Sequence, residues 1–146
     1  MAVPCMCGVL RQASRAVTRV YDDELRGAGL RATQYTLLRL LERSGEVRQR
    51  DLGGLASIDE TTLTRNLRPL MQAGWVSARA GEDRREKLVA ITEAGRAKVG
   101  QAGSAWQRAQ DRLRGALPEE TWDLVLRALP SLTGAAAEAS KSGEGT

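Results

Sequence analysis

The sequence contains no histidine among its 146 residues. This absence excludes a Ser-His-Asp or Cys-His nucleophile pair, a zinc site of the His-Glu-x-x-His type and an imidazole general base. The glycine-rich loops that bind nucleotide phosphates, Gly-x-x-x-x-Gly-Lys-Ser/Thr and Gly-x-Gly-x-x-Gly, are absent as well. The sequence therefore excludes most of the common catalytic mechanisms.

Aromatic residues and long apolar runs are scarce too. There is no phenylalanine, so with 42% hydrophobic residues the core must consist of Leu, Val and Ala. No apolar run approaches the roughly 18–20 residues that span a bilayer, and the N-terminus has no signal-peptide pattern. We therefore expect one cytoplasmic domain over residues 1–146 with no membrane partner. The aromatic residues are Tyr21, Tyr35, Trp75, Trp106 and Trp122.

Positive charge is concentrated in the middle of the chain. Residues 31–91 contain eleven basic and eight acidic residues, whereas residues 92–146 contain seven of each. The formal net charge is +4. A basic surplus of this kind is typical of nucleic-acid binders, and an ordinary basic surface fits it equally well.

Apolar residues recur with a period of about 3.6 in the first half of the chain, which predicts helices over residues 9–25, 33–45, 48–56 and 59–73. Thr33 is expected to cap the second helix and Asp59 the fourth. Gly53 and Gly54 are adjacent in the third helix, at a cost of about 1 kcal/mol each. Close packing or a local bend is the expected reason for this pair.

After Gly74 the apolar pattern alternates, which predicts a hairpin of strands 75–80 and 87–91 with a charged tip at 81–86. Thr92 is expected to cap a long helix that reaches about residue 115. Pro118 suits the first turn of a last helix, which Pro130 should kink. The tail over residues 134–146 is expected to be frayed.

This order of elements predicts a mostly α fold with a small β-hairpin wing. The central part, residues 31–91, is a winged helix-turn-helix, and long dimerisation helices flank it over residues 5–28 and 92–135. The winged helix-turn-helix is too small to cover the apolar faces of these outer helices. We therefore expect a homodimer.

The polar face of the fourth helix and the hairpin tip are the candidate DNA-binding surfaces. Threonine and arginine on a helix suit the major groove, because hydroxyls bond phosphates or bases and arginine forks to guanine. Arginines on a projecting hairpin suit the minor groove or phosphates, with Asp83 as a support that orients an arginine. The predicted DNA-binding residues are Thr61, Thr62, Thr64, Arg65, Arg68, Arg84 and Arg85.

With these motifs in place, the sequence resembles the MarR family of transcriptional regulators. The matching segments lie at residues 29–38, 51–52 with 55–56, 59–65, 74–76, 83–85 and 88–95. The most specific part is Asp83-Arg84-Arg85 followed by a strand and Thr92-x-x-Gly95. The resemblance implies a homodimer whose winged modules bind a near-palindromic DNA operator. A small ligand or an oxidation event then shifts DNA affinity. Pro69, within the fourth helix, departs from the pattern and should bend its last turn.

The two cysteines lie close together at the start of the first predicted helix. This stretch resembles the organic-hydroperoxide-sensing branch of the family, with Cys7 at the position of the reactive cysteine and Tyr21 at that of a tyrosine that hydrogen-bonds it. The branch's second tyrosine falls on Ala32, and a C-terminal resolving cysteine is absent. Cys5 instead offers a second thiol, which can resolve a sulfenate or bind a soft metal or cluster together with Cys7. Redox sensing, metal binding and an inert pair all remain open.

A small aromatic ligand is the other signal that the family resemblance implies, with Arg11, Arg15 and Tyr35 as the candidate pocket residues. The main prediction is a dimeric, sequence-specific DNA-binding regulator, a repressor released by a thiol-reactive signal or such a ligand. One alternative is a histidine-free, thiol peroxidase-like enzyme that uses Cys7. Another is a helical partner-binding module without a DNA role.

Overall fold

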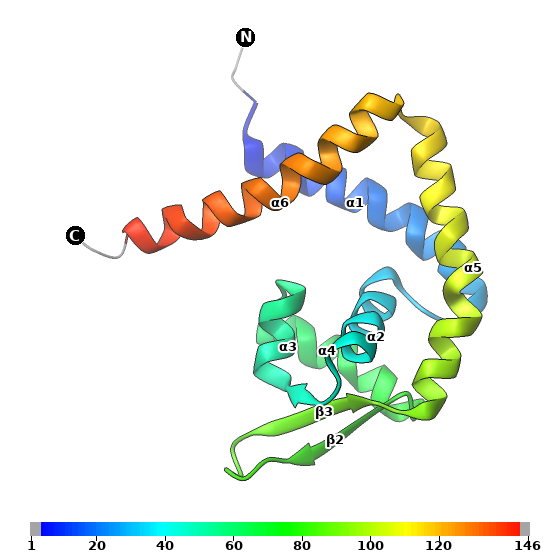
Figure 1. The fold of residues 1–146 in the computed structure, drawn as a ribbon, viewed down its shortest axis with the longest axis vertical. Helices are drawn as coiled ribbons and strands as arrows, with labels where there is room; N and C mark the ends of the chain where they lie inside the picture. The colour runs from blue at the N-terminus through cyan, green and yellow to red at the C-terminus, as the bar shows by residue number, and fades with distance from the viewer. Residues whose placement is uncertain (1–3, 144–146) are drawn as a thin grey trace. The chain divides into compact units, whose positions relative to one another are not determined.

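The computed structural model describes residues 4–143, which divide into two compact units, one up to Ala109 and one from Gln110 onward. Figure 1 shows the elements in chain order. A 3-10 turn at Arg26–Ala28 joins the first two helices. The helices and strands are α1 (Met6–Leu25), α2 (Ala32–Ser44), β1 (Val47–Arg48), α3 (Gln49–Ala56), α4 (Glu60–Gln72), β2 (Val76–Ala80), β3 (Lys87–Ile91), α5 (Glu93–Ala116) and α6 (Glu119–Ser142).

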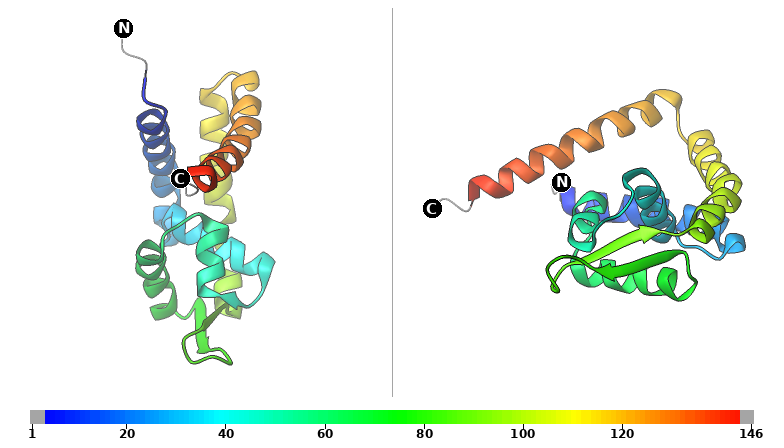
Figure 2. Two further views of the ribbon diagram at one scale, coloured as in Figure 1. Left: turned by 90° about the vertical axis from the view of Figure 1, so that its left-hand side faces the viewer. Right: turned by 60° about the horizontal axis from the view of Figure 1, so that its bottom comes forward.

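The sheet has three antiparallel strands in the order β1-β3-β2. In β3, Val89 lies opposite Val47 of β1 and Ala78 of β2. The two views in Figure 2 show the β2–β3 hairpin extending from the helices of the first unit. The predicted mostly α, winged helix-turn-helix fold is confirmed, with β1 as a strand that the sequence did not reveal. At two residues, β1 is too short to show an alternating pattern.

The core of the first unit is built largely from leucine, as the lack of phenylalanine requires. Helices α2, α3 and α4 supply leucines to the core, although Leu55 of α3 is exposed, and β3 contributes Val89 to the same cluster. The fully buried large side chains are Leu25, Leu37, Leu38, Leu41, Leu52, Leu63, Leu67, Leu70 and Val89. This packing fixes the orientation of α4 relative to the hairpin.

The start of α2 differs from the prediction that Thr33 caps it. Helix α2 begins at Ala32, whose backbone N–H donates to Asp22 Oδ1 at 2.7 Å. The backbone N–H of Arg31 donates to Gln34 Oε1 at 3.0 Å. The cap at Thr33 was therefore wrong, because a carboxylate ten residues earlier, on α1, accepts the unpaired donor.

Both other predicted caps are confirmed. The backbone N–H of Thr62 donates to Asp59 Oδ1 at 2.8 Å, and that of Gly95 donates to Thr92 Oγ1 at 3.0 Å. Close packing explains Gly53, where an added Cβ would lie 3.2 Å from the Ile58 carbonyl oxygen. It does not explain Gly54, which has open space around it.

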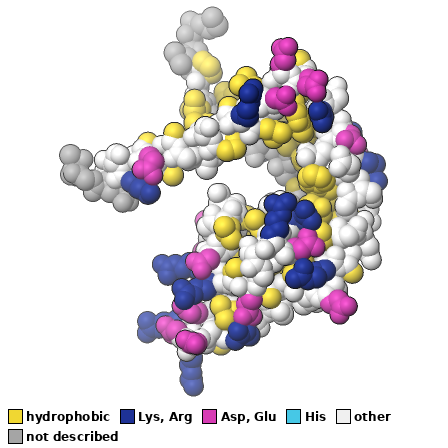
Figure 3. Space-filling view, viewed as in Figure 1, with side chains coloured by type: hydrophobic (Ala, Val, Ile, Leu, Met, Phe, Trp, Pro, Cys, Tyr) yellow, Lys and Arg dark blue, Asp and Glu magenta, His cyan; other side chains and the backbone are white. Residues whose placement is uncertain are grey.

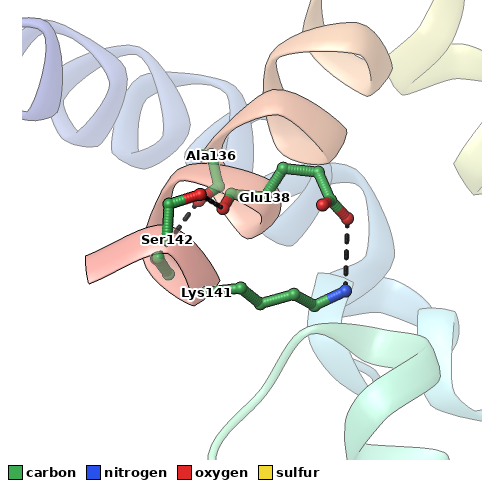
Figure 4. A network of polar contacts seen from close by, with 5 residues as sticks. Ala136, Glu138, Lys141 and Ser142 are labelled. Atoms are coloured by element: carbon green, nitrogen blue, oxygen red, sulfur yellow. Dashed lines mark hydrogen bonds and ion pairs between the residues drawn. The ribbon is translucent and has the colours of Figure 1, made fainter. Parts of the chain in front are cut away.

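The second unit contains the end of α5 and the helix α6. Residues 134–142 are helical rather than frayed, so that prediction was wrong, and α6 continues through Pro130 without a break. The reason is composition, because alanine, the best helix former, dominates residues 135–139. Figure 4 shows the last turns, where the Lys141 ammonium lies 3.2 Å from Glu138. Among the described residues, no helix is long and apolar enough to cross a membrane.

Candidate nucleic-acid interface

Helix α4 separates an apolar face from a polar one. Leu63, Leu67 and Leu70 are buried and anchor the helix in the core. On the opposite face lie the exposed side chains of Thr61, Thr64, Arg65 and Arg68. Together with Glu60, these four side chains line a shallow hollow of about 440 Å³. Four of the five residues predicted on this helix therefore form one surface.

Thr62, the fifth predicted residue, is half-buried and takes part in the helix cap. Its hydroxyl donates to Asp59 Oδ2 at 2.8 Å, beside the backbone bond to Oδ1. These hydrogen bonds, the backbone one first, hold the pKa of the Asp59 carboxyl below its usual range. The hydroxyl proton of Thr62 is thus engaged within the chain, and only a lone pair remains for a DNA contact.

Thr64 is oriented by a residue that the sequence did not single out. Gln49, at the start of α3, donates from Nε2 to Thr64 Oγ1 at 3.3 Å. Because the hydroxyl oxygen accepts this bond, its own proton can donate outward. Gln49 therefore favours Thr64 as a hydrogen-bond donor on the exposed face of α4. Only the fold brings these residues, fifteen positions apart, together.

The tip of the wing is closed by Asp83. Its carboxylate accepts from the backbone N–H of Arg85 at 3.1 Å, and its carbonyl accepts from the N–H of Glu86 at 2.9 Å. Asp83 thus supports the wing through the backbone of Arg85, whereas we expected it to orient an arginine side chain. Within residues 4–143, the exposed side chains of Arg84 and Arg85 have no ion-pair partner.

Two ion pairs that the sequence did not predict connect the hairpin to β1 and to the residue just before it. Arg79 of β2 binds Glu46 through two hydrogen bonds of 2.9 and 2.6 Å. The hydrogen bond from Arg79 lowers the pKa of the Glu46 carboxyl. Arg48 of β1 lies 3.4 Å from Glu86, next to the wing tip. Such exposed pairs add little stability, and what they supply here is a set position for the hairpin.

A groove of about 610 Å³ lies between the wing and the start of α3 and α4. Figure 3 shows Lys and Arg side chains around the hairpin tip, with acidic side chains among them. This arrangement offers a helix face of hydroxyls and guanidinium groups beside a cationic ribbon. The groove is lined by Arg48, Gln49, Arg50, Glu60, Thr64, Asp83, Arg85, Glu86 and Lys87.

Cys5 and Cys7 are exposed, free thiols at the start of α1. Cys5 is the N-cap residue of that helix, and Cys7 is its second residue. Burial raises the pKa of Tyr21, which lies further along the same helix. Across residues 4–143, no three His, Cys, Asp or Glu side chains gather into a possible metal site. A metal on the two thiolates would need further ligands from a second subunit.

The predicted ligand-pocket residues are not all brought together. Tyr35 is buried in the core, and its ring stacks on Trp106 with centroids 6.3 Å apart. Burial raises the pKa of its hydroxyl. The hollow beside this pair, about 210 Å³, is bordered by Arg39 and Arg43 instead of the predicted Arg11 and Arg15, which are exposed on α1.

Comparison with known proteins places this geometry among transcriptional regulators. A family model described as "MarR family" matches residues 30–87. The uncharacterized HTH-type transcriptional regulator YwoH of Bacillus subtilis (strain 168) is 32% identical over 84 residues, which is 58% of this chain. The matched part spans 61% of the length of YwoH.

Two solved structures share the fold over nearly the whole chain. The transcriptional regulator MosR of M. tuberculosis, in complex with DNA, is 34% identical, with a TM-score of 0.82 and coverage of 94% of this chain and 98% of MosR. A probable transcriptional regulator from Pseudomonas aeruginosa is 26% identical, with a TM-score of 0.77 and coverage of 87% and 96%. These relatives are regulators, not enzymes.

Proposed function

Because this chain belongs to the MarR family of transcriptional regulators, we propose that it binds duplex DNA in a sequence-specific manner, as a homodimer. The observation that carries this proposal is the continuous surface formed by the polar face of α4 and the wing. The DNA in the MosR complex supports it, since that regulator shares this fold at 34% identity.

In this proposal α4 enters the major groove. Arg65 and Arg68 offer forked donors to guanine, and Thr64 offers a hydroxyl proton to a base or phosphate. The wing places Arg84 and Arg85 on the minor groove or on phosphates. In a two-fold dimer, the two copies of α4 lie about one helical turn apart, roughly 34 Å.

The outer helices support the dimer. Leu124, Val125, Leu126 and Leu129 of α6 are each at least 39% exposed in the single chain, and α6 has no buried residue. Val9 and Val17 of α1 are exposed as well. A second copy that covers these side chains would remove a large apolar surface from water. Sedimentation that shows a monomer at micromolar concentration would contradict the dimer.

We further propose that the protein is a cytoplasmic repressor and that a thiol-reactive signal releases it from DNA. A hydroperoxide would oxidise the Cys7 thiolate to a sulfenic acid and leave as the alcohol. The Cys5 thiol would then displace water to form a disulfide. The exposure of both thiols at the start of α1 supports this step. A soft metal, or an aromatic ligand beside Tyr35 and Trp106, is the alternative signal.

Selection of binding sites from a randomised duplex library tests the DNA-binding function. The full chain should enrich a near-palindromic sequence. Arg65→Ala should lose about tenfold or more in affinity for that sequence, while its affinity for random duplex changes little. Arg43→Ala is the matched control, because it removes an exposed arginine of the same module from α2. A wild-type protein that enriches no sequence would refute the proposal.

A further inference from the structure

One carboxylate that lines both the groove and the hollow of this surface, that of Glu60, has no role in that proposal. Glu60 is the first residue of α4, and its side chain is exposed. It borders both the hollow along α4 and the groove beside the wing. Its carboxylate therefore stands where the two halves of the candidate interface meet.

The other carboxylates that line the groove, and that of the cap residue Asp59, already have partners. Asp59 accepts the backbone N–H and the hydroxyl of Thr62, and Asp83 accepts the N–H of Arg85. Glu86 lies 3.4 Å from the guanidinium of Arg48. In the described part of the chain, the Glu60 carboxylate has neither a hydrogen bond nor an ion pair. Both of its oxygens are thus available to a bound molecule.

An unpaired carboxylate lowers affinity for any phosphate that lies near it, because a DNA-binding surface gains its general affinity from positive charge. It is favourable only where it meets a hydrogen-bond donor. In the major groove the donors are the amino groups of cytosine and adenine, whereas guanine and thymine present acceptors. In adenine the acceptor N7 stands next to the amino group and opposes a second carboxylate oxygen.

We propose that Glu60 determines base specificity by accepting a hydrogen bond from the N4 amino group of a cytosine in each half-site. Its negative charge excludes guanine and thymine at that position, so that it selects by repulsion as well as by attraction. This inference rests on the proposed function. Thr64 lies one turn further along the same face of α4, and Gln49 orients it as a donor. Acceptor and donor thus stand side by side on the reading surface.

The test is selection from a randomised duplex library with the full-length chain as wild type, Glu60→Gln and Glu60→Ala. The wild type should require cytosine at one position of each half-site. Glu60→Gln should move that position to adenine, since a glutamine amide pairs with adenine N6 and N7. Glu60→Ala should remove the base preference at the same position, so that discrimination between cytosine and the other bases falls roughly tenfold there. All other positions should stay as in the wild type.

Glu93→Gln is the matched control, because Glu93 is likewise an exposed glutamate in the first turn of a helix, α5, borders neither the groove nor the hollow, and its loss changes the net charge equally. This variant should select the wild-type sequence. If both Glu60 variants also keep the wild-type preference at every position, the inference is overturned while DNA binding stands. If the wild type selects no sequence, the proposed function is refuted, and the inference about Glu60 is refuted with it. Circular dichroism on each variant shows whether the fold is intact.

Discussion

At the scale of single residues, Asp59 makes the stability of the start of α4 depend on pH. Hydrogen bonds from the backbone N–H and the hydroxyl of Thr62 lower the pKa of its carboxyl from the usual 3.8. A carboxyl whose pKa is lower in the folded than in the unfolded state adds stability above its unfolded pKa. That stability is lost as the pH falls through the folded pKa.

We therefore expect Asp59→Ala to lower the thermal unfolding midpoint relative to wild type above about pH 4, with a difference that shrinks as the pH falls further below the usual pKa of an aspartate. Thermal melts between pH 2 and 7 measure this. Asp51→Ala is the control, because Asp51 is an exposed aspartate in the first turn of α3. A midpoint difference for Asp59→Ala that does not change with pH would rule out the carboxylate as the source of the cap.

At the scale of elements, the wing is a cationic ribbon that two ion pairs connect to β1 and to the residue just before it. Arg79–Glu46 and Arg48–Glu86 hold the hairpin, while Arg84 and Arg85 project from its tip. The double variant Arg84→Ala/Arg85→Ala should weaken binding to all duplex DNA. It should also lower the slope of log affinity against log salt by about 2, one for each lost phosphate contact. Fluorescence anisotropy over a salt series measures both. Operator affinity equal to wild type would mean that the wing does not touch DNA.

The junction of β2 and α5 depends on Gly95. An added Cβ there would lie 2.2 Å from the carbonyl oxygen of Trp75, which is backbone and cannot move aside cheaply. We expect Gly95→Ala to lower the free energy of unfolding by about 2–3 kcal/mol. In contrast, Gly100→Ala, on an exposed part of the same helix with open space around it, should raise it by about 0.5–1 kcal/mol. Urea denaturation of both variants measures the free energy of unfolding and separates the effect of the close contact from the effect of helix propensity.

At the scale of the whole molecule, the proposed switch depends on the start of α1. In the proposed dimer, oxidation or ligation of Cys7 changes the partners of the first turn of α1 and shifts the spacing of the two copies of α4. A signal with a few kcal/mol of preference for one spacing suffices to move the population. We expect a hydroperoxide or a soft metal to lower operator affinity. Cys7→Ser should abolish this response and leave DNA binding of the untreated protein intact.

Cys5→Ser separates the two thiol mechanisms. Its effect should be weaker or purely kinetic if Cys5 only resolves a sulfenic acid, and equal to that of Cys7→Ser if both sulfurs bind a metal. Gel-shift titrations of reduced, oxidised and metal-treated protein distinguish these results. A Cys5/Cys7 double variant that still responds to the physiological signal would exclude the thiols. The hollow beside Tyr35 and Trp106 would then be the better candidate.

The sequence by itself determined the order of the helices and the hairpin, though not β1, and the polar face of α4. Periodicity located α1 to α4 and the hairpin, because the alternation of polar and apolar residues reflects which side of an element is buried. Asp59 and Thr92 were recognisable as caps because each bonds a backbone N–H three residues ahead. The absence of histidine and phenylalanine predicted a leucine core and a protein without histidine-based chemistry. These features depend either on composition or on neighbours within a few residues.

Only the tertiary structure decided the contacts between distant segments. Asp22 capping α2, Gln49 orienting Thr64 and Glu46 holding Arg79 join residues 10, 15 and 33 positions apart. Nothing in a local window marks such partners, because a carboxylate or amide satisfies a donor wherever the fold brings them within 3 Å or so. The sequence could not reveal that the Glu60 carboxylate has no partner, for the same reason. Its lack of a partner became visible only once the structure had paired the other carboxylates that line the groove.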